Sequence, residues 1–129
     1  NADGTKMYLV DGGPEKVFQY SLSTAWDLST ASYDNVFYTS SETDDLLDVS
    51  FNTDGTRMYL LSRFDQIFYQ YSLSTGFDIS TASYDSVSSS SINSQTIPSP
   101  YSTKFSADGT KLLVLSNAND TIFQYSTGL

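Results

Sequence analysis

The chain has 129 residues, contains neither cysteine nor histidine, and carries 6 basic against 15 acidic residues, for a net charge of −9. The lack of cysteine and histidine excludes disulfides, thiolate or imidazole zinc sites, and nucleophile systems that depend on histidine. The negative charge argues against nucleic acid and anionic membranes as partners, and no apolar run approaches the roughly 20 residues of a spanning helix.

Ten tyrosines and eight phenylalanines accompany abundant serine and threonine. These residues favour pleated, half-buried strands over helices, so we expect an all-β chain. The same composition, which is poor in lysine, is typical of exported proteins and of virion surface proteins. We therefore expect an extracellular, cell-surface or virion location.

In chain order, the first feature is an Asp-Gly-Thr tripeptide that recurs 51 and then 54 residues later. Each copy precedes a basic residue and an apolar run, and each is followed by a block that ends in Gln-Tyr-Ser. Glycine supplies the positive φ of a tight turn, and an aspartate side chain accepts hydrogen bonds from nearby backbone N–H groups. The residues that we expect to form structural turns are Asp3, Gly4, Asp54, Gly55, Asp108 and Gly109.

The apolar runs between these turns predict ten strands. They fall at residues 5–10, 17–22 and 35–40, at 46–51, 57–62, 66–73 and 84–90, and at 101–105, 111–116 and 121–126. Four short antiparallel strands in a period of about 50 residues are typical of a β-propeller blade. The prediction is therefore about two and a half four-stranded blades, with a β-sandwich of ten strands as the alternative. The first blade is partial (1–40), the second complete (41–91) and the third partial (92–129).

The stretch from Phe105 to Tyr125, FSADGTKLLVLSNANDTIFQY, resembles the repeat of YVTN-type and related WD40-like propellers of surface, secreted and phage proteins. The resemblance covers most of the chain. It implies a propeller architecture but no particular activity, because such propellers serve as adhesion, scaffolding and enzyme frames alike.

One acidic cluster is not repeated, namely Glu42, Asp44, Asp45 and Asp48. Carboxylate oxygens in a loop suit calcium, although the spacing matches no recognised calcium motif. The alternative is a solvated acidic loop, and no other cofactor is predicted. The remaining acids recur at equivalent positions, as in Asp27 and Asp78 or Asp34 and Asp85, which indicates structural roles.

Trp26 and Phe77 occupy equivalent positions, directly before Asp27 and Asp78. An aromatic ring with polar neighbours could stack on a sugar, which makes a glycan a candidate partner. Packing between blades is the alternative that we favour.

A propeller needs at least four blades, so this chain would expose apolar blade faces and strand edges at both ends. We expect either further repeats of the same protein or a homo-oligomer joined head to tail. The predicted function is a non-enzymatic adhesion or interaction scaffold at a cell or virion surface. One alternative is a filament-forming structural subunit, and another is a fragment of a carboxylate-dependent propeller hydrolase or lyase.

Overall fold

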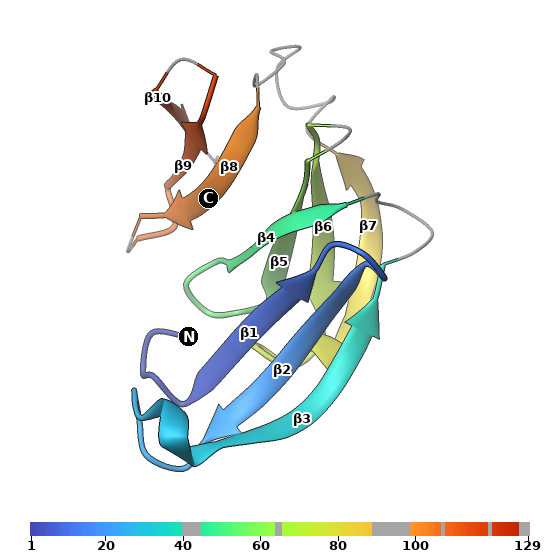
Figure 1. The fold of residues 1–129 in the computed structure, drawn as a ribbon, viewed down its shortest axis with the longest axis vertical. Helices are drawn as coiled ribbons and strands as arrows, with labels where there is room; N and C mark the ends of the chain where they lie inside the picture. The colour runs from blue at the N-terminus through green and yellow to red at the C-terminus, as the bar shows by residue number, and fades with distance from the viewer. Residues whose placement is uncertain (40–44, 64–65, 89–98, 107, 119, 127–129) are drawn as a thin grey trace.

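A computed structural model describes residues 1–39, 45–63, 66–88, 99–106, 108–118 and 120–126, which form three antiparallel β-sheets (Figure 1). The predicted all-β class is confirmed. Within these ranges the helical elements are two single 3-10 turns, η1 (Leu28–Thr30) and η2 (Ile79–Thr81). None of the described helices is long and apolar enough to cross a membrane.

The three sheets follow one another along the chain, and in each the neighbouring strands are consecutive in sequence. Sheet 1 contains β1 (Lys6–Asp11), β2 (Lys16–Leu22) and β3 (Ala31–Tyr38). Sheet 2 contains β4 (Leu46–Phe51), β5 (Arg57–Ser62), β6 (Phe68–Leu73) and β7 (Ala82–Ser88). Sheet 3 contains β8 (Pro100–Phe105), β9 (Lys111–Ser116) and β10 (Thr121–Ser126).

Strands β3 and β7 begin earlier than the sequence predicts, at Ala31 and Ala82. The physical reason is that each 3-10 turn ends directly in extended backbone, with φ −67° and ψ 130° at Ala31. The strand therefore starts at the residue after the turn, and no loop separates the two.

The Asp-Gly-Thr tripeptides form turns just before β1, β5 and β9. Gly4, Gly55 and Gly109 have φ of 75°, 72° and 72°, a region that residues with a Cβ rarely adopt. In the first turn, Asp3 Oδ1 accepts hydrogen bonds from the Thr5 backbone N–H at 2.9 Å and from Thr5 Oγ1 at 2.6 Å. The other two tripeptides make the same pair of bonds.

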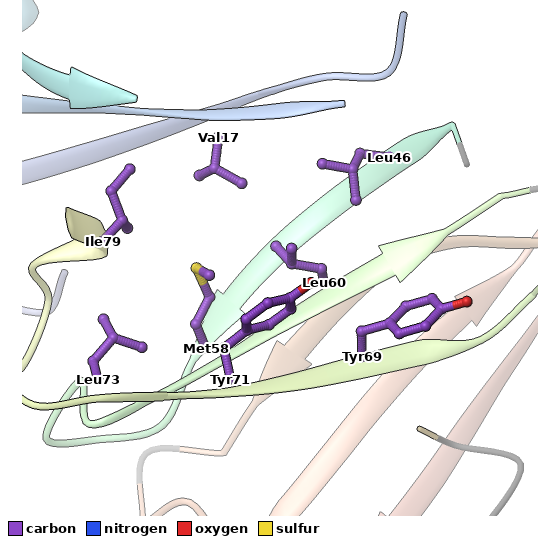
Figure 2. Close-up of a cluster of buried hydrophobic side chains, with 8 residues drawn as sticks. All are labelled: Val17, Leu46, Met58, Leu60, Tyr69, Tyr71, Leu73 and Ile79. Carbon is purple, nitrogen blue, oxygen red and sulfur yellow. The ribbon is translucent and has the colours of Figure 1, made fainter. Parts of the chain in front are cut away.

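Two hydrophobic cores lie between the sheets. Core 1 joins sheets 1 and 2 and consists of Val17, Leu46, Met58, Leu60, Tyr69, Tyr71, Leu73 and Ile79 (Figure 2). Core 2 joins sheets 2 and 3 and consists of Leu61, Phe68, Leu112 and Val114. Sheet 2 is therefore covered on both faces.

Strand β5 shows why the apolar runs lack alternation. Met58 and Leu60 point into core 1, whereas Leu61 points into core 2. Successive side chains of a strand face opposite sides, so a strand between two cores is apolar at every position. The result is an open stack of three sheets that does not close into a ring, with one sheet lying within each of the predicted segments 1–40, 41–91 and 92–129.

Candidate functional site

Two members of the predicted calcium cluster, Asp45 and Asp48, belong to the described part of the chain, whereas Glu42 and Asp44 lie outside it. Asp48 is in strand β4, and its Oδ2 accepts hydrogen bonds from the Thr103 N–H at 2.6 Å, from Thr103 Oγ1 at 3.1 Å and from Ser102 Oγ at 3.2 Å. Asp48 therefore ties β4 of sheet 2 to β8 of sheet 3.

Asp45 lies just before β4 and has a different partner. Its Oδ2 is 3.7 Å from Arg63 Nε. Across the described ranges, no three acidic side chains come close enough together to hold a metal ion. The calcium site stays a prediction that depends on the whole cluster, and a solvated acidic loop stays the alternative that we favour.

The recurring acids form one hydrogen-bonded network in sheet 1 and an equivalent network in sheet 2. In sheet 1, Asp34 Oδ2 accepts from Lys6 Nζ at 2.8 Å, from Ser21 Oγ at 2.6 Å and from Gln19 Nε2 at 3.0 Å. In sheet 2, Asp85 Oδ2 accepts from Arg57 at 2.9 Å and from Gln70 Nε2 at 2.7 Å. Each network joins all three strands that follow the Asp-Gly-Thr turn.

These bonds determine the chemistry of the carboxylates. The hydrogen bond from Lys6, followed by that from Ser21, lowers the pKa of Asp34 from 3.8 to about 2. Hydrogen bonds also lower the pKa of other described aspartates, namely Asp3, Asp27, Asp54, Asp78 and Asp108. A glycosidase acid needs a carboxyl group with a raised pKa, so these residues are unsuited to that role.

Gln19 extends the first network across core 1. While its Nε2 donates to Asp34, its Oε1 accepts the backbone N–H of Ile79 at 2.9 Å. Ile79 is the first residue of η2, which Asp78 caps by accepting from the Ser80 N–H. Sequence reasoning missed this link, although a glutamine recurs in the block before each Tyr-Ser, at positions 19, 70 and 124.

The two predicted stacking residues pack on the turn glycines. Trp26 and Phe77 have positive φ, 66° and 63°, and lie so close that a Cβ on Gly4 or Gly55 would come within 2.4 Å of the aromatic ring. Phe77 is half-buried between sheets 1 and 2, where Tyr8 Oη donates to its carbonyl at 2.6 Å. Trp26 is 73% exposed, so of these two aromatic rings only that of Trp26 is available for a ligand.

Exposed apolar side chains mark the two outer faces of the stack. We define the head face as the side of sheet 1 turned away from sheet 2. Tyr8 and Val10 pack against core 1, so Leu9 between them points to the head face. Trp26, Leu28 and Tyr33, which are exposed like Leu9, are assigned to it because their repeat equivalents in sheet 2 lie on the side of core 1. We define the tail face as the side of sheet 3 turned away from sheet 2, with Tyr101, Leu115 and Ile122 exposed on it. A shallow hollow in the tail face is lined by Tyr101, Leu115, Ser116, Asn117 and Asp120.

Comparison with known proteins gives likeness at the level of fold. No family model matches the chain, and no curated protein matches it. A matching solved structure is the crystal structure of a functionally unknown protein from Desulfotomaculum acetoxidans DSM 771, with 12% identity and a TM-score of 0.51. The match covers 100% of this chain and 38% of that protein, so the chain spans well under half of its length.

Proposed function

We propose that this chain is a β-propeller-type repeat unit that acts as a non-enzymatic interaction scaffold at a cell or virion surface. The observation that carries the proposal is the stacking of three sheets, each built from one copy of the repeat, through two separate cores. Sheets that pack face to face in series are the building principle of propellers. The surface location rests on the composition alone.

The non-enzymatic part of the proposal rests on the described carboxylates. Asp34 and Asp85 form ion pairs with Lys6 and Arg57, and Asp48 accepts a hydrogen bond from the backbone of the neighbouring strand β8. A catalytic carboxylate pair would instead present free oxygens to a shared space. Scaffolding also suits the exposed faces, which would receive further repeats of the same protein or copies of this chain.

A glycan is the ligand that we propose for Trp26 in a copy whose head face is not covered by another sheet, because its exposed ring is supported from behind by Gly4. An aromatic ring held in this way offers a flat apolar surface at little entropic cost, because its orientation is already set. The filament-forming alternative is favoured by one observation, that the head and tail faces lie at opposite ends of the same stack.

The test combines binding with turnover. The purified chain would be incubated with a panel of immobilised and soluble polysaccharides, and retention, reducing-end release and unsaturated products would be measured. We expect retention without product, and we expect Trp26→Ala to reduce it while Tyr38→Ala, which changes another exposed aromatic residue on β3, does not. Product formation by the wild-type chain would overturn the proposal in favour of the hydrolase or lyase alternative.

A further inference from the structure

The head face of sheet 1 is built from the same repeat positions as the face of sheet 2 that is buried in core 1. Leu28 is equivalent to Ile79, and the two side chains are 66% and 0% exposed. Leu9 is likewise equivalent to Leu60, since each precedes the last apolar residue of the run after its turn. The chain thus shows, in its own interior, how a head face is covered.

The tail face has the same relation to core 2. Ile122 is equivalent to Phe68, and these side chains are 65% and 5% exposed. Leu115 is equivalent to Leu61, which is fully buried against sheet 3. Each outer face therefore has a buried counterpart within sheet 2, and the covering surface in both cases is another sheet of this repeat.

Resting on the proposed scaffold function, we infer that the head face binds the tail face of a second copy of this chain. The contact would continue the series of sheets. Sheet 3 of one copy would pack on sheet 1 of the other, in the position that sheet 1 occupies relative to sheet 2 within a chain. Such a contact is heterologous, since two different surfaces meet, and it can repeat from copy to copy.

One polar contact fixes the register of the two copies. Within the chain, Gln19 Oε1 on β2 accepts the backbone N–H of Ile79 in the next sheet. Gln124 is the equivalent residue on β10, and Leu28 is the equivalent of Ile79. In the assembly Gln124 of one copy therefore accepts the backbone N–H of Leu28 of the other.

The contact between copies lacks one bond of the internal interface. Tyr8 Oη donates to the Phe77 carbonyl across core 1, whereas the equivalent position on β9 is Leu113, which has no hydroxyl group. Each copy also carries a net charge of −9. We therefore expect reversible association that strengthens as salt screens the repulsion between copies.

The test uses Leu28→Asp to damage the head face and Ile122→Asp to damage the tail face. Both side chains are about equally exposed in the single chain, so both variants should keep their fold, as circular dichroism would verify. Sedimentation velocity should show the wild-type chain forming oligomers with rising concentration and salt. Each variant alone should remain monomeric at concentrations where the wild-type chain associates, because its affinity for copies of itself should fall at least tenfold.

Mixing the two variants gives the decisive result. The intact tail of Leu28→Asp should bind the intact head of Ile122→Asp, so the mixture should form a one-to-one dimer and nothing larger. Trp26 is the single tryptophan of the chain and lies on the head face. With Trp26→Phe added to the Leu28→Asp variant, dimer formation should shift the remaining tryptophan emission to shorter wavelength.

A wild-type chain that is monomeric at all concentrations would overturn the inference, and so would a mixture that does not form a dimer. Association that only one of the two substitutions abolishes would indicate a symmetric contact and would also overturn it. If Asp disturbs either fold, Leu28→Ser and Ile122→Thr replace the pair with the same expectations. None of these outcomes depends on polysaccharide binding or turnover, so the scaffold proposal stands or falls separately.

Discussion

Truncation of Ile79 and of Leu28 to alanine should have very different effects on the stability of the single chain, although the two residues occupy the same repeat position. Ile79 is fully buried in core 1, and a large-to-small change at such a site costs about 2–5 kcal/mol. Leu28 is 66% exposed, so about one third of its side chain is buried. One third of the roughly 1.5–3 kcal/mol gained by full burial is about 0.5–1 kcal/mol.

The assay is urea unfolding followed by far-ultraviolet circular dichroism at low micromolar protein, where association between copies is least. We expect the free energy of unfolding to fall by at least about 1 kcal/mol more for Ile79→Ala than for Leu28→Ala. Equal losses at both sites would refute the reasoning, because they would mean that the head face is covered within one chain.

Three further predictions concern the turns, the carboxylate network and the acidic cluster. Gly55→Ala should destabilise more than Gly109→Ala in thermal denaturation, because its Cβ would lie 2.4 Å from the Phe77 ring whereas the nearest atom at Gly109 is 3.2 Å away. Asp34→Asn should cost up to about 1 kcal/mol near neutral pH, since its partly exposed ion pair is screened by solvent. The pKa of Asp34 is lowered from 3.8 to about 2, so this stabilisation is present above pH 4 and should be lost progressively as the pH falls through 2; a pH-independent difference in urea unfolding would contradict it. Asp48→Ala should cost about 1–3 kcal/mol by leaving a backbone N–H of β8 without its acceptor, and calcium should leave the wild-type unfolding midpoint unchanged. A calcium-induced rise that Asp48→Ala removes would support a metal site.

The repeat carried most of the information about secondary structure. Because each Asp-Gly-Thr turn positions the strand that follows it, the sequence predicted β5 and β9 with the boundaries that the structure has, 57–62 and 111–116. The continuous apolar run of β5 also agrees with the burial of sheet 2 on both faces. Local pattern was sufficient here because turns and two-sided burial leave a signature in adjacent residues.

Contacts between sheets were less accessible to sequence reasoning. The predicted strand 46–51 already contained Asp48, but its bond to the backbone of Thr103, 55 residues away, was not predicted. The bond from Ile79 to Gln19 spans 60 residues in the same way. No local sequence pattern specifies which sheets pack together. Hydrogen bonds between residues of different sheets can therefore be identified only from the three-dimensional arrangement.

The unequal size of the two cores has a consequence for how the stack opens. Among the described residues, core 1 contains eight that are buried, whereas core 2 contains four. In a series of units that touch only their neighbours, the weakest junction separates first. Amide protons of β9 should therefore exchange with solvent before those of β5, and the carboxy-terminal sheet should detach while sheets 1 and 2 are still folded together. A chain built in this way unfolds from one end, and a second copy bound to sheet 3 would slow that local unfolding.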